Sequence, residues 1–307
     1  MIKIDNLHKS FSGFQAVSGI DFSVISGEVL GFLGPNGAGK STTMKMITGF
    51  IKPTRGEISI FDHNIEKAPL KAKALIGYLP EGAPAYGDMR VSQFLDFIAE
   101  IRGFKGQKKQ QRVNKVVKQL ALESVVHRPI DNLSKGFKRR VGIAQAIIHD
   151  PKVLILDEPT DGLDPNQKHQ VRELIRGLSK DKIVIISTHI LEEVTAVCTR
   201  AIIIAEGKLV ADESPEQLQA RSRYHRALTV ELSEEQANAQ TQFSQLAGVE
   251  RVEAVDACRF TLLPEANVDL LEPVNQLIKQ QKWQVNELYV EKGRLDDVFR
   301  TLTQEVV

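Results

Sequence analysis

A glycine-rich stretch near the start of the sequence has the residue types of a loop that binds phosphate. Gly34–Ser41 reads GPNGAGKS and fits the pattern G-x-x-x-x-G-K-[ST]. The glycines allow successive backbone N–H groups to point at a phosphate, and the N-terminus of the following helix adds partial positive charge. Lys40 is expected to reach the β- and γ-phosphates of a nucleotide, and Ser41 to bind Mg²⁺.

Two adjacent carboxylates follow an apolar run further along the chain. Val153–Pro159 reads VLILDEP, which delivers Asp157 to the carboxyl end of a buried strand, where open α/β sheets bind ligands. A carboxylate across from Ser41 completes a Mg²⁺ site made of oxygen ligands. Glu158 comes next and is placed to polarise a water that attacks the γ-phosphate.

A histidine occupies a similar position after a third strand. Ser187–His189 reads STH and directly follows the apolar run Ile183–Ile186. A histidine at the carboxyl end of a strand can touch a bound γ-phosphate. In isolation, a structural histidine is the more common case. His189 is therefore a candidate only together with the two motifs above.

The elements that position these motifs read as alternating strands and helices. We expect strands at Val29–Leu33, Val153–Leu156, Ile183–Ser187 and Ala201–Ala205, with helices at Ser41–Thr48 and Asn166–Leu178. Such alternation predicts a parallel sheet wrapped by helices. Further strands are expected within Ile2–Ser26 and at Glu57–Ile60 and Leu75–Leu79.

Residues 88–150 change in character and read as a helical insertion. Helical spacing is found at Val91–Ile101, Arg112–Leu122 and Phe137–His149. Between the first two lies GFKGQKKQQR, residues 103–112, which we expect to be a basic polar loop. It could bind phosphate, but a solvated connection between helices is the more common arrangement for such a charge run.

The last part of the chain reads as a small second domain after a break near Ala220–Arg226. The expected order is strand, helix, strand, strand, helix, strand, helix, as in a split-βαβ sandwich. The strands are Leu228–Leu232, Val249–Val255, Arg259–Leu263 and Trp283–Val290, and one helix is Val268–Gln281. This region carries no cluster of catalytic residues.

Composition limits the class of protein. The 307 residues suggest two domains, and 40 basic against 39 acidic residues argue against binding nucleic acid through a large basic field. Cys198 and Cys258 form neither a CxxC motif nor a Cys/His cluster, which suits a reducing cytosol. We expect no transmembrane span, because no apolar run approaches ~20 residues, and no signal peptide, because the N-terminal stretch is broken by charges.

Together these motifs resemble the nucleotide-binding domain of ABC transporters over roughly residues 1–220. The family's LSGGQ-type signature is matched by Leu133–Phe137, which reads LSKGF and precedes LILDEPTDGLDP. The resemblance implies an ATPase with a P-loop NTPase core, an antiparallel β subdomain and the helical insertion. Residues 221–307 would be a small α+β accessory domain.

The resemblance also implies roles for individual residues. Phe11 would stack on adenine, Glu158 would be the general base, and His189 would be the switch histidine. Asp157 resembles the Mg²⁺ ligand and Asp164 the D-loop residue that communicates across a dimer. The phosphate loop that binds ATP would comprise Gly34, Pro35, Asn36, Gly37, Ala38, Gly39, Lys40, Ser41 and Thr42.

The family acts as head-to-tail dimers, so a homodimer or a pair with a paralogous ATPase is implied. Ser134 and Gly136 of one chain would contact the γ-phosphate held by the other. The sequence departs from the family at Glu81, where glutamine is usual, and at Lys135 and Phe137 in the signature. Glu81 can still ligate Mg²⁺ or order water, but it adds negative charge beside the phosphates.

Glu81, the LSKGF form and the accessory domain resemble the branch that serves ABC-2-type exporters and the gliding-motility system. A separate transmembrane permease would then dock near residues 81–90, and the chain would lie on the cytoplasmic face of the membrane. The alternative is a soluble ABC ATPase without a permease, acting in cofactor assembly or complex remodelling. Neither function involves nucleic acid.

Overall fold

In the computed structural model, which describes residues 1–83, 85–266 and 268–304, the predicted parallel strands lie in one six-stranded sheet. Its order is β10-β9-β3-β8-β7-β6, and the five strands from β9 to β6 are parallel, while β10 pairs antiparallel with β9. The strands are β3 (Val29–Leu33), β6 (Ile76–Leu79), β7 (Val153–Asp157), β8 (Ile183–Ser187), β9 (Arg200–Ala205) and β10 (Lys208–Glu213).

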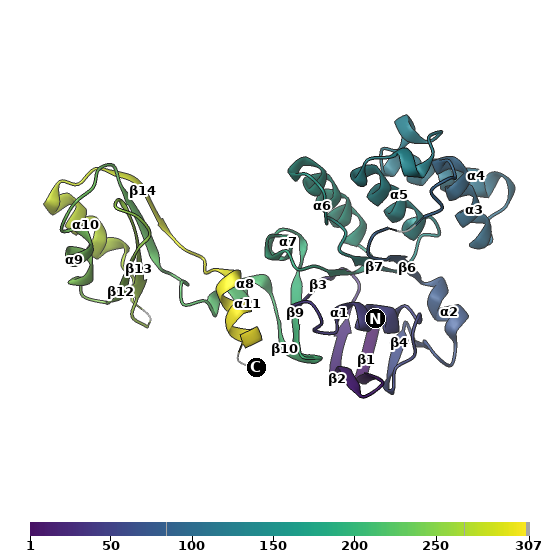
Figure 1. Cartoon of the computed structure of the whole chain (residues 1–307), viewed down its shortest axis with the longest axis horizontal. Coiled ribbons are helices and arrows are strands. Elements are labelled where there is room, and N and C mark those ends of the chain that lie inside the picture. The colour runs from purple at the N-terminus through teal and green to yellow at the C-terminus, as the bar shows by residue number, and fades with distance from the viewer. Residues whose placement is uncertain (84, 267, 305–307) are drawn as a thin grey trace. The chain divides into compact units, whose positions relative to one another are not determined.

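The two faces of this sheet support two separate hydrophobic cores. Strands β7 and β8 are buried throughout, and their side chains alternate between the faces. Leu154 and Ile186 belong to the core beneath the helical insertion, whereas Ile155 and Ile185 belong to the core on the opposite face. Figure 1 shows α3–α5 on one side of β6 and β7, with β1, β2 and β4 on the other.

The core on that opposite face is closed by a second sheet. This antiparallel sheet has the order β2-β1-β4-β5, and helices α1 and α2 belong to the same side of the unit. The bounds are β1 (Ile2–Phe11), β2 (Phe14–Val24), β4 (Arg55–Ile60), β5 (His63–Asn64), α1 (Lys40–Ile47) and α2 (Pro69–Ala74). The sheet is the antiparallel β subdomain that the resemblance implies.

The helical insertion consists of α3 (Val91–Ile101), α4 (Gly106–Gln119) and α5 (Lys135–Ile147), with short 3₁₀ turns at Glu123–Val125 and Ile130–Asn132. The prediction of a loop over residues 103–112 is wrong, because α4 begins at Gly106. The buried residues of α4, which are Val113, Val116 and Val117, all lie in its later turns. The first turns are formed by Lys and Gln, which are good helix formers even when exposed.

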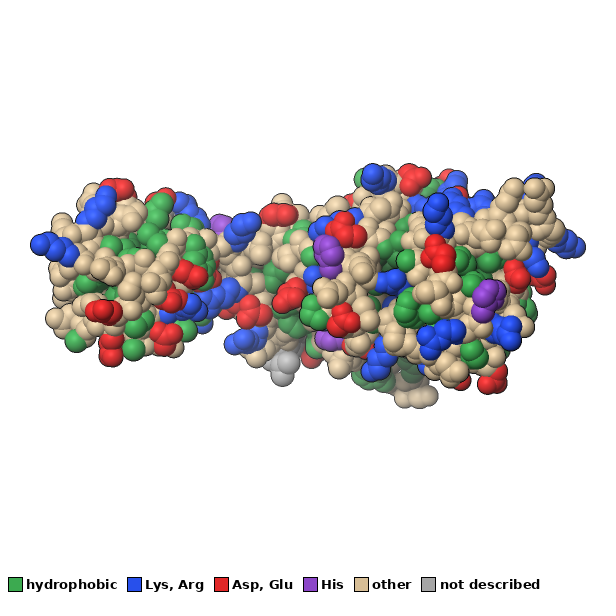
Figure 2. Space-filling view, turned by 90° about the horizontal axis from the view of Figure 1, so that it is seen from above, with side chains coloured by type: hydrophobic (Ala, Val, Ile, Leu, Met, Phe, Trp, Pro, Cys, Tyr) green, Lys and Arg blue, Asp and Glu red, His purple; other side chains and the backbone are tan. Residues whose placement is uncertain are grey.

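Two more helices complete the first unit, which spans residues 1–214. Helix α6 (Pro165–Ser179) connects β7 to β8, and α7 (Leu191–Val197) connects β8 to β9. Basic and acidic side chains are interspersed over the visible face of this unit in Figure 2, in keeping with the net charge of +1. In the part of the chain that the structure describes, no helix is long and apolar enough to cross a membrane.

The second unit spans residues 215–304, so its start differs by a few residues from the expected 221, and residues 305–307 lie outside the described part. Its antiparallel sheet has the order β12-β13-β11-β14, the arrangement of a split-βαβ sandwich. The elements are α8 (Pro215–Ala220), β11 (Leu228–Leu232), α9 (Ala239–Ser244), β12 (Val249–Ala254), β13 (Arg259–Pro264), α10 (Leu271–Gln281), β14 (Val285–Val290) and α11 (Leu295–Gln304). Helices α9 and α10 supply Phe243 and Val274 to its core.

Candidate functional site

The order of the parallel strands brings four predicted motifs to one edge of the sheet. Strand β8 lies between β3 and β7, and β6 lies next to β7. The carboxyl ends of β3, β8, β7 and β6 therefore deliver the phosphate loop, His189, the Asp157–Glu158 pair and Glu81 side by side. This edge is where open α/β sheets bind ligands.

The phosphate loop has a backbone that only glycine can adopt at one position. Gly39, which caps α1, has φ 107°, and a Cβ atom there would lie 2.5 Å from the carbonyl oxygen of Ala16. An L-residue is both strained at this φ and in collision with the neighbouring strand. Ser41 and Thr42 follow, half-buried, in the first turn of the helix. The free N–H groups of that turn are the donors that a phosphate accepts.

Lys40 folds back over the loop that precedes it. Its ammonium donates to the carbonyl oxygens of Gly34, at 2.7 Å, and Pro35, at 3.1 Å, and only 7% of the residue is exposed. Burial lowers the pKa of Lys40, and the negative charges of Glu158 and Asp157 oppose that shift. The ammonium is thus held at the loop by weak acceptors that a phosphate oxygen, with its full charge, can replace.

Asp157 is buried at the last position of β7. Its register partner on β8 is Ser187, whose hydroxyl donates a hydrogen bond to Oδ1 of Asp157. The residue is 3% exposed, so that bond fixes the direction of the carboxylate. Removing the donor would leave a buried charge without this partner, which is costly.

Glu158 is turned out of the strand by its backbone. It has φ 49°, in the left-handed region that is uncommon for residues with a side chain, and its N–H donates to the carbonyl oxygen of Ser187. Its Oε2 lies 2.9 Å from Nδ1 of His189. The histidine side chain is 56% exposed and that of Glu158 only 15%. His189 therefore orients a mostly buried carboxylate at the edge.

Glu81 follows β6 and is exposed in the turn after it. Its charge acts on Lys40, whose pKa it helps to raise against burial. Burial raises the pKa of Tyr78 to about 12, and the charges of Asp157 and Glu81 add to that shift. The edge thus concentrates negative charge before any nucleotide binds.

The donor set at the edge fits Mg²⁺. The carboxylate of Asp157, the hydroxyl of Ser41 and the carboxylate of Glu81 are hard oxygen ligands. Within residues 1–83, 85–266 and 268–304, no three His, Cys, Asp or Glu side chains gather as a metal cluster. Mg²⁺ is commonly held by one or two carboxylates, with substrate phosphates and water as its other ligands.

The signature residues lie at the start of α5 rather than on the strands. Ser134 caps the helix, and its hydroxyl accepts a hydrogen bond from the N–H of Phe137 at 3.4 Å. Gly136 is buried where α5 meets α6, since a Cβ atom there would lie 2.6 Å from Cδ of Gln167. Ser134 itself is exposed, so the helix presents its N-terminus, with partial positive charge, to the outside.

Asp164 and Phe11 also lie off the strand edge. Asp164 caps α6, and its Oδ1 accepts a hydrogen bond from the N–H of Gln167 at 2.9 Å. Phe11 ends β1 and is 44% exposed, with Nζ of Lys9 4.9 Å from its ring centroid. Phe14, its register partner on β2, is 62% exposed. The hairpin therefore presents two aromatic rings rather than the single one that the sequence indicated.

Two residues of this region were missed by the sequence analysis. Ser187 belongs to the STH motif, but only the histidine was assigned a role, although the serine is the one that contacts Asp157. Arg139, on α5, is 6% exposed and is surrounded by the charges of the carboxylates at the edge. A basic residue within an amphipathic helix gives no sequence signal that it faces inward.

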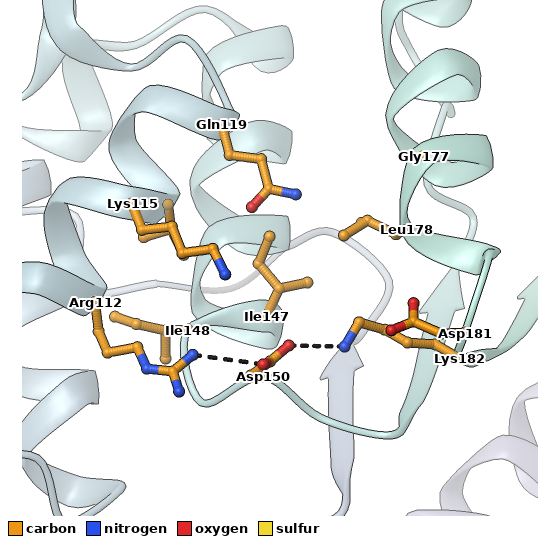
Figure 3. A pocket seen from close by; sticks show the side chains of 11 residues that line it. Arg112, Lys115, Gln119, Ile147, Ile148, Asp150, Gly177, Leu178, Asp181 and Lys182 are labelled. Atoms are coloured by element: carbon orange, nitrogen blue, oxygen red, sulfur yellow. Dashed lines mark hydrogen bonds and ion pairs between the residues drawn. The ribbon is translucent and has the colours of Figure 1, made fainter.

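A charged cavity of about 270 Å³ lies away from this site, between α4 and the ends of α5 and α6 (Figure 3). Within it, Oδ1 of Asp150 lies 2.7 Å from Nζ of Lys182, and Oδ2 lies 3.6 Å from Nη1 of Arg112. These cations lower the pKa of Asp150, Lys182 most of all. The cavity adjoins the amino ends of β7 and β8, opposite the carboxylate edge. Its basic side chains are balanced by the charge of Asp150 and by the partial negative charge at the C-termini of α5 and α6.

Comparison with known proteins gives concordant results. Residues 17–161 match the family described as "ABC transporter". The chain is 32% identical to the uncharacterized ABC transporter ATP-binding protein YhcH of Bacillus subtilis, over 99% of this chain and 96% of that protein. It is 36% identical to the Nod factor export ATP-binding protein I of Burkholderia lata, over 71% and 72% of the two chains. The structure of CbiO1 from Clostridium perfringens, part of the ABC transporter complex CbiONQ, superimposes with a TM-score of 0.66 and 31% identity, covering 72% of this chain and 90% of that one.

Proposed function

The chain belongs to the ABC transporter family as an ATP-binding subunit with ATPase activity, and from this premise we propose that it drives export through a separate transmembrane permease. The observation that carries the ATPase part of the proposal is the carboxylate edge, where the charges of Asp157 and Glu158 act on Lys40. The support for export is the similarity to a Nod factor export ATP-binding protein.

Each side chain at the edge has a distinct part in hydrolysis. The Lys40 ammonium exchanges the carbonyls of Gly34 and Pro35 for the β- and γ-phosphate oxygens of ATP. Ser41 and Asp157 would hold Mg²⁺, which neutralises charge on the phosphates when it is bound. Glu158 accepts a proton from the attacking water, and His189 keeps that carboxylate aimed at the γ-phosphate.

The signature of one chain serves the nucleotide of another. Ser134 is exposed at the N-terminus of α5, with no phosphate-loop residue among the hydrogen-bond partners of its hydroxyl in the described part of the chain. A helix N-terminus stabilises an anion. We therefore expect two copies, or a pair with a paralogue, to close on ATP with Ser134 and Gly136 against the partner's γ-phosphate and Asp164 at the interface.

The surface beside Glu81 supports a partner with an apolar contact. Tyr86, Phe97 and Ile101, called the apolar patch below, are 60%, 37% and 64% exposed. The rings of Tyr86 and Phe97 meet edge to face, with centroids 5.8 Å apart. Exposed apolar clusters mark interaction sites. Tyr86 lies in the same segment of the chain as Glu81, between β6 and α3. A permease docked on the apolar patch would therefore sense the nucleotide edge, and the ATPase would lie at the cytoplasmic face of the membrane.

The test is copurification of the tagged full-length chain from detergent-solubilised membranes of its own organism. We expect a polytopic membrane protein to be recovered with the wild type. Phe97→Glu and Ile101→Glu should reduce recovery by about tenfold or more, since each places a charge in a buried contact. Val255→Glu, at a 60% exposed apolar position in the second unit, is the matched control.

Recovery of the membrane protein with all variants alike would remove the apolar patch from the proposal. Recovery of only soluble partners would support the alternative, an ABC ATPase that acts in cofactor assembly or complex remodelling.

A further inference from the structure

A buried arginine beside the carboxylate edge has one nitrogen with no hydrogen-bond partner among the described residues. Arg139, in the second turn of α5, is 6% exposed. Its Nη1 is buried and has no hydrogen-bond partner in the described part of the chain. Burying an unpaired guanidinium costs several kcal/mol. A carboxylate that reaches this nitrogen in another state of the protein would recover that cost.

The face of α5 that carries Arg139 is packed against the segment that holds Glu81. Gly142 lies three residues further along the helix, and residues at that spacing share a face. A Cβ atom at Gly142 would lie 2.6 Å from Cδ1 of Leu79 and 3.0 Å from Cβ of Ala83. These two residues flank Glu81 in the chain. The helix therefore meets the end of β6 and the following turn with no space for another side chain.

The first turn of α5 is equally close to the segment after Glu158. A Cβ atom at Gly162 would lie 3.5 Å from Cδ of Lys135, and one at Gly136 would lie 2.6 Å from Cδ of Gln167. Arg139 thus lies between the turn of Glu81 and the segment that contains Asp161. Burial lowers the pKa of Arg139, while the charges of Asp161, Glu158, Asp157 and Glu81 oppose that shift, in decreasing order.

Of these four carboxylates, two are already held by other side chains. Asp157 accepts from Ser187, and Glu158 is bound to His189. The side chains of Asp161 and Glu81 make no hydrogen bond or ion pair with the residues that the structure describes. Asp161 is part of the turn after β7, where its N–H donates to the carbonyl oxygen of Glu158. Glu81 lies between Leu79 and Ala83, the two residues against which the face of α5 that carries Arg139 is packed.

We propose that Arg139 is a positioning residue of the ATPase site, whose guanidinium pairs with the Glu81 carboxylate when the site closes on ATP. The pair satisfies a buried cation and neutralises the extra charge that Glu81 brings next to the phosphates. In this arrangement Ser41 and Asp157, and not Glu81, would hold Mg²⁺. Because Arg139 and Ser134 belong to the same helix, a movement of Glu81 also moves the signature. The inference deepens the proposed function and rests on ATP hydrolysis at this edge.

The test is a double-mutant cycle measured as steady-state ATP hydrolysis by the purified full-length chain. Arg139→Met should lower kcat by about tenfold or more and change KM for ATP by less than about threefold. Residues that interact directly show couplings of about 2- to 150-fold, so a loss of this size is measurable. In the Glu81→Gln background, the same substitution should lower kcat by less than about threefold. Arg139→Lys should recover part of the lost rate because it keeps the charge.

Two comparisons make the cycle specific. Arg140→Met removes the neighbouring arginine, which bonds to Gln170 on α6, and should leave kcat unchanged. A second cycle pairs Arg139→Met with Asp161→Asn and should show the smaller coupling. Equal proportional losses in the wild-type and Glu81→Gln backgrounds would overturn the proposal, and so would a larger coupling to Asp161.

Two controls distinguish loss of the Arg139–Glu81 pair from loss of folding and from failure of the proposed ATPase site. Urea unfolding of each variant shows whether a lost rate reflects lost structure, and the Arg139→Lys variant retains the buried charge if Arg139→Met fails to fold. Export is not at issue, because the assay contains no permease. If Glu158→Gln hydrolyses ATP at the wild-type rate, the proposed site fails, whatever the cycle shows.

Discussion

His149 should make the first unit sensitive to acid. It follows the end of α5, where its Nε2–H donates to the carbonyl oxygen of Ile76 on β6 at 3.0 Å. Its Nδ1 is buried and has no partner in the described part of the chain. Burial, and then the positive charge of Arg102, lower the pKa of His149 from 6.5 to about 4. This imidazole joins the helical insertion to the parallel sheet, and its burial favours the neutral form.

The direction of the effect follows from which state binds the proton more tightly. Between pH 6.5 and 4 the unfolded chain protonates at this position and the folded chain does not, so acid favours unfolding. The stability is present above pH 6.5 and is lost as the pH falls toward 4. With these two pKa values, the free energy of unfolding decreases by about 2 kcal/mol between pH 7.5 and pH 5.0.

Urea unfolding of the full-length chain at pH 7.5 and pH 5.0 measures this decrease. Other groups also titrate, so the informative quantity is the difference between wild type and His149→Gln, whose amide can still donate to Ile76. The variant should lose about 2 kcal/mol less than the wild type on acidification. His127→Gln, at an exposed position of the same insertion, should behave as the wild type does. Equal acid losses in wild type and His149→Gln would refute the reasoning.

Three further substitutions test the phosphate loop, the buried carboxylate and the hairpin. Gly39→Ala forces a Cβ atom to within 2.5 Å of the carbonyl oxygen of Ala16 at φ 107°, so titration with a fluorescent ATP analogue should show affinity reduced by about tenfold or more. Wild-type affinity would contradict this. Ser187→Ala removes the donor to Asp157 and should lower the free energy of unfolding by about 1.5–3 kcal/mol. A value from urea unfolding within about 0.5 kcal/mol of wild type would show that this hydrogen bond does not stabilise the fold. Phe11→Ala should weaken ATP binding by about three- to tenfold if its ring stacks on adenine, and an unchanged dissociation constant would remove Phe11 from that role.

The parts of the site that could be predicted are those that a short, continuous sequence motif specifies. An apolar run followed by Gly34–Ser41 or by Asp157–Glu158 specifies a strand, its end and the chemistry there. The fold class followed from the same alternation and from the resemblance to ABC ATPases, and the structural neighbours confirm it. The roles assigned to individual residues stay predictions, which the substitutions above test.

The parts that could not be predicted depend on contacts between distant segments. The bond from Ser187 to Asp157 joins residues 30 positions apart, through the register of β7 and β8. The inward direction of Arg139 depends on how α5 packs against β6. The first turns of α4 were misjudged because an exposed run of Lys and Gln lacks the apolar period by which a helix is recognised, while its intrinsic helix propensity is high.

The strand β10 (Lys208–Glu213) was also absent from the predicted elements. Its residues KLVADE mix charged and apolar types without a clear alternation, and only Ala211 is buried. It is an edge strand, fixed by antiparallel pairing with β9 rather than by its own pattern. Edge strands have fewer buried positions, so their sequences are less constrained than those of central strands.

The central claim is that ATP is hydrolysed at the carboxylate edge with Glu158 as the base, and one substitution tests it most directly. Glu158→Gln keeps the size of the side chain and can still bond to His189, but it cannot accept a proton. Hydrolysis should decrease by about 10²- to 10⁴-fold, while the dissociation constant for ATP stays within about threefold of wild type. The reason is that the Glu158 side chain bonds to His189 and to no phosphate-loop residue in the described part of the chain. Wild-type turnover by Glu158→Gln, in protein that binds ATP normally, would contradict the account.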